Sequence, residues 1–154
     1  MIKHIKGDIF EQNADVICHQ VNCQGVMGSG VAKQVRAKYP WVYATYKRAC
    51  ENSKRYGVRS LGRCQEVFID EEKVIVNIFA QENYGYDGKL YTDYKVLNNC
   101  LGIIKESYKG KTIAMPYLMG CHRGGGDWNV VYEMIKNIFD DDETTLLICE
   151  YNGG

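Results

Sequence analysis

Two glycine-rich segments are the parts of this sequence best suited to hold a negatively charged ligand. The first is GVMGSG at residues 25–30, and the second is MGCHRGGGD at residues 119–127. Glycine lets backbone N–H groups approach oxygen atoms without a Cβ atom in the way, and a helix that follows adds the positive end of its dipole. The two segments therefore predict a cradle for phosphate oxygens, although the glycines of a single such segment could equally serve a turn.

Neither segment matches the best-known phosphate-binding motifs. GVMGSGVAK lacks the GxxxxGK[ST] spacing of a P-loop, and GSGVAK lacks the third glycine of the GxGxxG fingerprint. The sequence therefore indicates neither a P-loop nucleotide hydrolase nor a Rossmann dehydrogenase.

Three titratable side chains lie in or near these segments and could do chemistry. His19 follows the apolar run ADVIC, and histidine can accept or donate a proton near neutral pH. His122 and Arg123 lie inside the second segment, where they could bind a terminal phosphate and stabilise its charge. The alternatives are a structural histidine at the end of a strand for His19 and solvent-facing loop side chains for the other two.

Cysteine usage argues against a metal site. The seven cysteines are an odd number and include no CxxC pair, and the grouping of Cys18, His19, Cys23 and Cys121 matches no closed zinc pattern. We therefore expect reduced, mostly buried thiols in a cytosolic protein, with no metal ion and no cofactor.

Length, composition and charge predict one ordinary globular domain covering residues 1–154. Hydrophobic residues make up 45% and charged residues 25%, and the 19 basic residues balance the 19 acidic ones. Because no net charge attracts the chain to nucleic acid or to an anionic membrane, we expect any anion to be bound locally. No long apolar run predicts export or membrane insertion, so the expected location is the cytoplasm, and the expected state is a monomer.

The elements that would position these residues alternate along the chain. After a strand near the N-terminus, the patterns predict a strand at 15–18, helices at 31–39 and 41–50, neighbouring strands at 64–69 and 73–81, a helix from Tyr94 capped by Thr92, a strand at 111–116, a helix capped by Asp127 and a strand at 144–151. Strands alternating with amphipathic helices imply a largely parallel sheet with helices on both faces. Ligands of such sheets bind beyond the carboxyl ends of the strands, where both glycine-rich segments are expected.

The sequence resembles the macro domains, a family that binds ADP-ribose, over nearly its whole length. GDIF at residues 7–10 is similar to the family's GDI or GDL element, HQVNCQGVMGSGVA to its first ligand loop and MPYLMGCHRGGGDW to its second. The resemblance is strongest to macro domains that process ADP-ribose-1″-phosphate, with DNA- and protein-directed ADP-ribosyl hydrolases as near neighbours. It implies a three-layer α/β/α fold with a mixed, largely parallel central sheet of about six strands.

The resemblance also implies roles for particular residues. By it, Asp8 accepts the adenine amino group, Ile9 packs nearby, Asn22 binds the distal ribose and Tyr151 flanks adenine. The alternatives are a loop-capping carboxylate for Asp8 and an ordinary edge-strand aromatic for Tyr151. The other residues expected at the ligand are Gly25, Gly28, Ser29, Gly30, Val31, Gly120, Cys121, His122, Arg123, Gly124, Gly125 and Gly126.

For catalysis the sequence departs from its relatives. Hydrolases of the neighbouring branch use a lysine, paired in some members with an aspartate, where this chain has Gln81 and Gly124. A covalent lysine mechanism is therefore not expected, and Lys89, eight residues further on, lies in a loop whose course the sequence does not indicate. His19 stands where the yeast phosphatase has a histidine, so we expect His19, with His122, to act on the distal phosphate.

Three functions remain open at this point. The first is hydrolysis of ADP-ribose-1″-phosphate to ADP-ribose and phosphate, the second is removal of ADP-ribose from a protein or nucleic acid, and the third is binding of ADP-ribose without turnover. In each case the expected partner is ADP-ribose or a derivative, and no direct binding of unmodified nucleic acid is expected.

Overall fold

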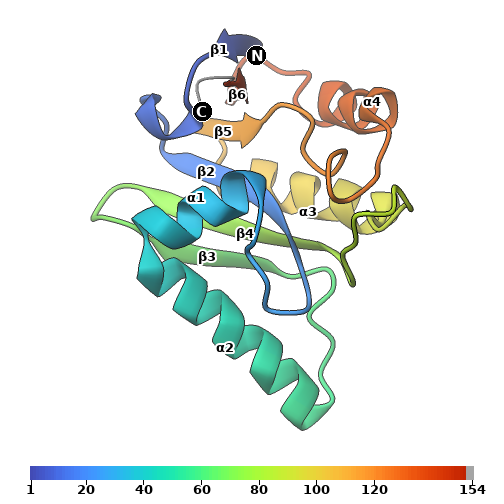
Figure 1. Ribbon diagram of the computed structural model, residues 1–154. Coiled ribbons are helices and arrows are strands. Elements are labelled where there is room, and N and C mark those ends of the chain that lie inside the picture. The colour runs from blue at the N-terminus through green and yellow to red at the C-terminus, as the bar shows by residue number, and fades with distance from the viewer. Residues whose placement is uncertain (152–154) are drawn as a thin grey trace.

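The computed structural model describes residues 1–151 and contains one six-stranded sheet at its centre (Figure 1). The strands are arranged in the order β1-β6-β5-β2-β4-β3, and every neighbouring pair is parallel except β3 and β4, which are antiparallel. The sheet is therefore mixed and largely parallel, as expected. Its strands are β1 (Ile2–Lys6), β2 (Val16–Asn22), β3 (Cys64–Phe68), β4 (Val74–Gln81), β5 (Thr112–Pro116) and β6 (Thr145–Glu150).

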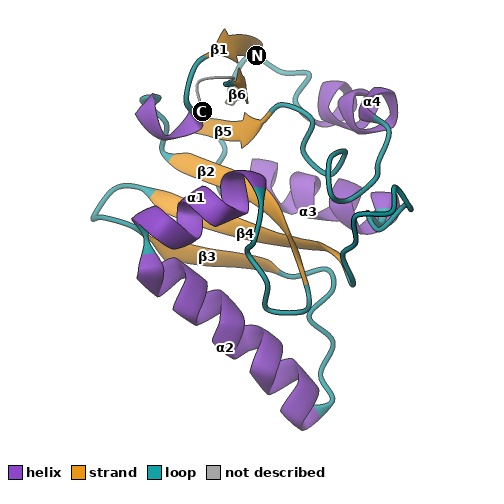
Figure 2. Cartoon of the chain, viewed as in Figure 1, coloured by secondary structure: helices purple, strands orange, loops and turns teal. Residues whose placement is uncertain are grey.

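Helices cover both faces of this sheet and complete a three-layer α/β/α fold (Figure 2). One face packs against α3 and α4, and the other against α1 and α2 with the short 3-10 helix η1. The helices are α1 (Gly30–Lys38), α2 (Pro40–Tyr56), α3 (Tyr94–Ser107) and α4 (Trp128–Ile138), and η1 spans Ile9–Glu11.

Burial on both faces explains the apolar runs in the central strands. In β2, Val16 and Cys18 pack into the core under α3 and α4, whereas Ile17 and Val21 pack into the core under α1 and α2. All eight residues of β4 are buried. The sequence of a strand that is covered on both faces is a continuous apolar run, which is typical of parallel sheets.

Strand β2 is longer than the sequence indicates: it continues beyond the apolar run through His19, Gln20 and Val21 as far as Asn22. These residues remain in the strand because β2 pairs with β4 up to Gln81, with one irregularity between Val21 and Asn22. Two of the polar side chains find partners across that pair, His19 with Asn77 and Gln20 with Gln81.

The cap of α3 corrects one prediction. Thr92 is not the N-cap: its hydroxyl donates to the carbonyl of Gly120, and the Asp93 carboxylate caps the helix by accepting from the N–H of Val96. A carboxylate one residue later satisfies the same free N–H groups and leaves the threonine for a different contact. The predicted cap of α4, Asp127, is confirmed, because its side chain accepts from the N–H of Asn129.

All seven cysteines are free thiols, and five of them are buried. Among the described residues, no helix is both long and apolar enough to cross a membrane.

Candidate functional site

A cleft of about 540 Å³ lies where the central parallel strands end. It is lined by parts of both glycine-rich segments, by the start of η1, by the end of β6 and by residues 84–86. This is the edge at which ligands of open α/β sheets bind. The residues of the expected site that line it are Asp8, Ile9, His19, Asn22, Gly28, Ser29, Gly30, Val31, Gly120, His122, Arg123, Gly124 and Tyr151.

The side chain of Asn22 shapes the first glycine-rich loop. Its Oδ1 accepts from the N–H of Gln24 and from the hydroxyl of Tyr46, at 2.9 Å and 2.8 Å, and its Nδ2 donates to the carbonyl of Val26 at 2.9 Å. An amide nitrogen carries two hydrogens, so one N–H of Asn22 is left for a ligand.

The residues after this loop form the beginning of α1. Gly28, Ser29 and Gly30 line the cleft, and Gly30 starts the helix with a φ of +58°, a conformation that glycine adopts without strain. Ser29 precedes the helix without capping it through its side chain. The first N–H groups of a helix have no partner within it, so this end of α1 offers donors to an anion.

Gly25 faces away from the cleft, contrary to expectation. A Cβ atom at Gly25 would lie 3.8 Å from the side chains of both Lys47 and Cys50 on α2, and the Gly25 carbonyl accepts from the hydroxyl of Tyr43. Its φ of +81° shows that the residue is needed for the turn. Gly25 therefore ties the loop to α2.

Three residues of the second segment also lie outside the cleft lining. A Cβ atom at Gly125 would lie 2.0 Å from the carbonyl oxygen of Lys89. A Cβ atom at Gly126 would lie 2.7 Å from the carbonyl oxygen of Gly120. Cys121 is directed into the core against α3 and α4, and its thiol donates to the carbonyl of Met119. These residues let the second loop pack closely on itself and on residues 89–92.

Two aromatic residues between β4 and α3 form one wall of the cleft. Tyr84 and Tyr86 line it, and the guanidinium of Arg123 lies 4.0 Å from the centre of the Tyr86 ring. This contact joins the wall to the second glycine-rich loop. His122, next to Arg123, lines the cleft and is exposed.

Asp8 and Ile9 lie at the part of the cleft that also contains Tyr151. One oxygen of Asp8 accepts from the N–H of Phe10 at 2.9 Å, so the carboxylate does cap η1, and its second oxygen has no partner among the described residues. Ile9 is buried and Tyr151 is exposed. The loop-capping role of Asp8 therefore leaves one oxygen for a ligand.

His19 is the most deeply buried polar group of the cleft. Its Nε2 lies 2.6 Å from Oδ1 of Asn77 on β4, and Nδ2 of Asn77 donates to Oε1 of Gln65 on β3 at 3.0 Å. Because the Asn77 oxygen can only accept, Nε2 of His19 must carry the hydrogen and Nδ1 must carry the lone pair. Nδ1 is buried and has no hydrogen-bond partner among the described residues.

Burial also sets the charge of His19. It lowers the pKa of the imidazole to about 4, because the low-dielectric interior disfavours the imidazolium, and the hydrogen bond to Asn77 opposes the shift only in part. At neutral pH the ring is uncharged. His19 is therefore an uncharged lining residue of the cleft with one buried acceptor, Nδ1.

A second polar cluster surrounds Gln81, the position at which the resemblance implies a lysine in neighbouring hydrolases. Nε2 of Gln20 donates to Oε1 of Gln81 and to the hydroxyl of Thr92, both at 2.8 Å, and Gln81 donates onward to the carbonyl of Asn83. Oε1 of Gln20 is buried and has no partner among the described residues. The amide of Gln81 is thus engaged in internal contacts.

The geometry at Gly124 leaves no room for a side chain. A Cβ atom at Gly124 would lie 2.2 Å from the hydroxyl oxygen of Thr92 and 2.6 Å from the carbonyl oxygen of Gly120. Lys89 does not replace the missing lysine, because it lies outside the cleft lining and its ammonium is exposed, 3.8 Å from the carboxylate of Asp87.

Several cleft residues were not predicted from the sequence. Gln20 lines the cleft, and Asn77 on the neighbouring strand holds His19 from behind it. The pairs Gln20–Gln81 and His19–Asn77 depend on a strand register that a single sequence does not reveal. Leu118 lines the cleft with a φ of +63°, which is uncommon for a residue other than glycine and is found at functional sites. No local sequence signal marks that conformation.

Comparisons with known proteins agree with this geometry, although no family model matches the chain. The DNA ADP-ribosyl glycohydrolase of Mycobacterium tuberculosis is 29% identical over 159 residues, covering 100% of this chain and 43% of the relative. The ADP-ribose 1″-phosphate phosphatase of Aspergillus fumigatus is 41% identical over 59 residues, covering 36% of this chain and 30% of the relative. The chain thus spans less than half the length of these curated relatives.

Solved structures share the whole fold. The macrodomain of Thermus aquaticus DarG has a TM-score of 0.77 at 23% identity, covering 97% of this chain and 98% of that one. Thermosipho africanus DarTG in complex with ADP-ribose has a TM-score of 0.76 at 19% identity, covering 97% of this chain and 41% of that one. The sheet and these similarities show that the chain has the macrodomain fold.

Proposed function

We propose that this chain binds ADP-ribose in the cleft and hydrolyses a derivative of it there. One observation carries the proposal: both glycine-rich segments line a cleft of about 540 Å³, and the buried His19, whose Nδ1 has no partner among the described residues, also belongs to that lining. A cleft of this volume suits a ligand of nucleotide size. The bound ADP-ribose of Thermosipho africanus DarTG, which has the same fold, supports the choice of ligand.

In the proposed pose the ligand extends across the strand ends. Adenine lies near Ile9 and Tyr151, with its amino group donating to the open oxygen of Asp8, and the distal ribose lies near His19 and Asn22. The diphosphate lies between the two glycine-rich loops, where the start of α1 supplies N–H donors.

The reaction that we propose first is hydrolysis of ADP-ribose-1″-phosphate. Water attacks phosphorus, the bond from phosphorus to the anomeric oxygen breaks, and that oxygen leaves as a hydroxyl with a proton from the water. Neutral His19 accepts a hydrogen bond from the water through Nδ1 and orients it, while His122 and Arg123 bind the phosphate oxygens. The products are ADP-ribose and inorganic phosphate.

Removal of ADP-ribose from DNA is the second candidate. The sequence match to a DNA ADP-ribosyl glycohydrolase extends over all of this chain, whereas the match to the phosphatase covers about a third of it. In this reaction water would attack the anomeric carbon and the bond to the nucleic acid would break. Because Gln81 is engaged with Gln20, the orienting role would again fall to His19.

The test is to incubate the purified protein separately with ADP-ribose-1″-phosphate, ADP-ribosylated protein and ADP-ribosylated DNA, and to quantify phosphate and free ADP-ribose. We expect phosphate release from the first substrate. Release of ADP-ribose from DNA alone would replace the first candidate by the second. Binding of ADP-ribose without any product would identify a binding module and refute hydrolysis.

Calorimetry with ADP-ribose, AMP and ribose-5-phosphate tests the ligand itself. We expect ADP-ribose to bind most tightly, because only it reaches all parts of the cleft, and equal affinity for the three would refute the proposal. Lys89→Ala is the matched control for a lysine mechanism, since Lys89 is exposed and lies outside the cleft lining. Its activity should equal that of the wild type.

A further inference from the structure

The basic and acidic residues of this protein are equal in number but unevenly distributed along the chain. Residues 30–63 contain nine Lys or Arg and a single acidic residue, Glu51, whereas the rest of the chain contains ten Lys or Arg and eighteen acidic residues. The first group has a formal charge of +8 and the second of −8. These 34 residues comprise α1, α2 and the loop that leads to β3.

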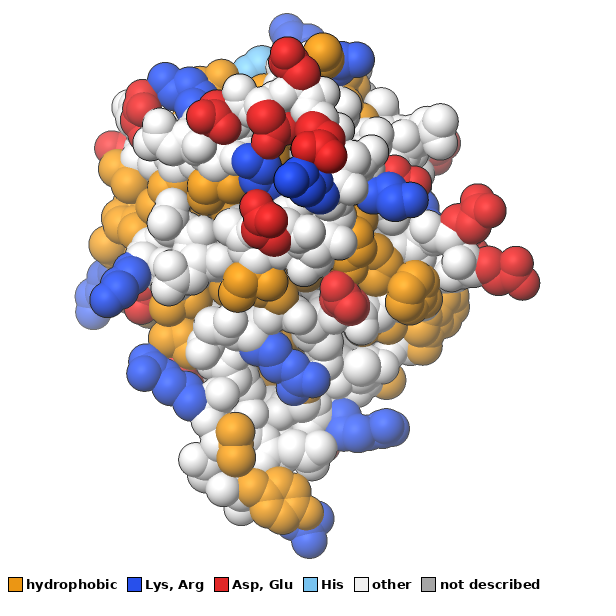
Figure 3. All heavy atoms as spheres, turned by 180° about the vertical axis from the view of Figure 1, so that it is seen from behind, with side chains coloured by type: hydrophobic (Ala, Val, Ile, Leu, Met, Phe, Trp, Pro, Cys, Tyr) orange, Lys and Arg blue, Asp and Glu red, His pale blue; other side chains and the backbone are white. Residues whose placement is uncertain are grey.

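The basic side chains of this region are exposed and uncompensated. All nine are classed as exposed, and none of them forms an ion pair within the part of the chain that the structure describes. The space-filling view shows the result: acidic and basic side chains are mixed over the upper part of the visible face, whereas the charged side chains around the end formed by α2 are basic (Figure 3). The molecule therefore has one cationic end.

On α2 these charges form an ordered stripe. Trp41, Arg48 and Arg55 recur every seven residues, so they lie in one row, and Lys47 and Lys54 form the adjacent row. The helix of 17 residues is about 25 Å long, at about 1.5 Å per residue. We call this exposed face of α2, together with its five named side chains, the basic stripe.

The middle of the stripe lies beside the first glycine-rich loop. The side chain of Lys47 lies next to Gly25, and Arg36 on α1 stacks on the ring of Tyr43, whose hydroxyl donates to the Gly25 carbonyl. Arg59 lies close enough to Cys23 to oppose the rise in pKa that burial imposes on that thiol. Cationic groups thus border the first glycine-rich loop on its outer side.

Exposed aromatic rings accompany these charges. Trp41 is 47% exposed at the start of α2, and Tyr56 is 67% exposed at its end. Basic side chains that follow a backbone, with aromatic rings on which bases stack, are the combination that binds single-stranded nucleic acid. An anionic membrane would be attracted by the charge alone.

We infer that the basic stripe binds the phosphodiester backbone of a single-stranded nucleic acid, in addition to the ligand bound in the cleft. A strand lying along α2 would reach the outer side of the first loop, so a nucleotide that carries ADP-ribose would be held near the cleft. The binding of unmodified strands depends only on the stripe and not on the function proposed for the cleft.

The experiment measures fluorescence anisotropy of a labelled oligothymidylate of about twenty nucleotides, which exceeds the usual site size of about 4 to 16 nucleotides per domain. The test variant replaces Arg48, Lys54 and Arg55 by Gln, and the control variant replaces Lys3, Lys95 and Lys111 by Gln. All six residues are exposed, and both variants lose three positive charges. Any effect of net charge alone is thereby matched.

We expect the stripe variant to bind at least about tenfold more weakly at low salt, and its plot of log K against log[salt] to flatten by about 2 units, or about 0.7 per lost phosphate contact. The affinity of the control variant for the oligonucleotide should stay within about twofold of the wild-type affinity. The tenfold loss expected for the stripe variant corresponds to about 1.4 kcal/mol of binding free energy. Equal losses in the two variants, or no binding by the wild type, would refute the inference.

Two further arms separate the alternatives. Vesicles of phosphatidylglycerol and phosphatidylcholine in equal parts should bind more weakly than the oligonucleotide, because they engage the charges but not the aromatic rings. A preference for the vesicles would refute the inference in favour of a membrane. A duplex of the same length should bind more weakly than the single strand, and the opposite order would refute the role of the exposed aromatic rings. Calorimetry with ADP-ribose should give the wild-type affinity for the stripe variant, so failure of the cleft proposal would be seen separately.

Discussion

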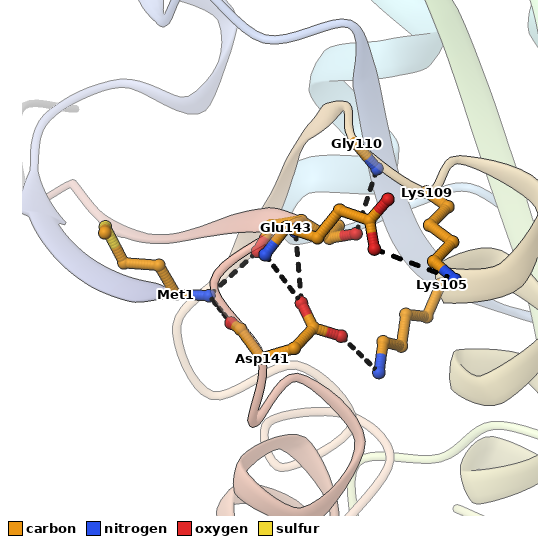
Figure 4. Close-up of polar contacts among 7 residues, drawn as sticks. Met1, Lys105, Lys109, Gly110, Asp141 and Glu143 are labelled. Atoms are coloured by element: carbon orange, nitrogen blue, oxygen red, sulfur yellow. Dashed lines mark hydrogen bonds and ion pairs between the residues drawn. The ribbon is translucent and has the colours of Figure 1, made fainter.

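Buried polar groups at the amino ends of the strands find partners, whereas some at the carboxyl ends do not. At the edge where the strands begin, the Asp141 carboxylate accepts from the N–H groups of Glu143 and Thr144 and pairs with Lys105 at 2.7 Å, and the Thr144 hydroxyl accepts from the N–H of Gly110 (Figure 4). At the edge where the strands end, His19 and Gln20 each keep a buried polar atom without a partner among the described residues.

This difference separates a structural network from a binding site. A buried polar atom without a partner typically costs about 1–3 kcal/mol, so a fold retains one where something else can satisfy it. The Asp141 network connects the loop before β6 to α3 and leaves little for a ligand to add. At the cleft, by contrast, two buried acceptors have no partner among the described residues, which favours a site that bound donors complete.

The largest effect that would distinguish the two edges is expected from His19→Ala. Removing the acceptor that orients water should lower phosphate release from ADP-ribose-1″-phosphate by about 100-fold to 10,000-fold, while the affinity for ADP-ribose stays within a few fold. Single-turnover kinetics and calorimetry measure the two quantities. Normal turnover in this variant, with loss in His122→Ala, would transfer the role to the second loop.

Gly28→Val and Gly125→Val should separate ligand binding from loop packing. Gly28 lines the cleft and has only the Val26 side chain near a Cβ atom, so valine should weaken ADP-ribose binding by at least about tenfold with little change in Tm. Valine at Gly125 would collide with the Lys89 carbonyl and strain a φ of +68°, so it should lower Tm. Calorimetry and thermal unfolding of both variants test this, and the reverse pattern would contradict the assignment.

Asn77→Asp tests whether Asn77 positions His19. A carboxylate beside Nε2 favours the imidazolium, so the pKa of His19 should rise from about 4 by about one unit or more. The acid limb of the pH–rate profile should move upward with it, and an NMR titration of the imidazole reports the same shift. A purely structural role for Asn77 would change stability without moving either curve.

The smallest effects are expected in the pH dependence of stability. His19 has its pKa lowered from 6.5 to about 4, so unfolded chains bind a proton that the fold does not, and stability falls as pH drops from 6.5 to about 4. The hydrogen bond from Lys105 is the main cause that lowers the pKa of Asp141 from 3.8 to about 2, so its contribution is lost across that lower interval.

Urea unfolding at a series of pH values measures both contributions. His19→Gln should reduce the pH dependence of the free energy of unfolding between pH 6.5 and about 4, and Asp141→Asn should reduce it between pH 3.8 and about 2. Asp141→Asn should leave the affinity for ADP-ribose unchanged. Loss of ligand affinity in Asp141→Asn would show that the Asp141 network and the cleft are coupled, and would contradict their separation into a structural network and a binding site.

Most of the fold could be predicted from sequence, because strand burial and helix amphipathicity are local patterns. The antiparallel β3 and β4, the sheet with helices on both faces and the Asp127 cap follow from such patterns. The end of β2 does not, because residues 19–22 remain in the strand through partners on β4 that are distant in sequence. Thr92 and Asp93 are both good caps, and the position of Gly120 decides between them.

The candidate site was predictable to the extent that glycine spacing indicates a loop at a strand end. Which glycines face the ligand depends on neighbouring chain segments: α2 lies beside Gly25, and the carbonyl of Lys89 lies beside Gly125. The expectation that unmodified nucleic acid does not bind rests on total charge, whereas the inference of a basic stripe rests on the distribution of charge over residues 30–63. The anisotropy experiment decides between the two.

The sheet order has a consequence for how the chain folds. Strand β1 lies at an edge and pairs only with β6, as Ile2 with Leu146 and Lys6 with Glu150. At a synthesis rate of about 5–20 residues per second, β1 waits about 7–30 s for its partner. Contacts of such long sequence separation slow folding, so β1 is expected to join last and to expose its hydrogen-bonding groups until then.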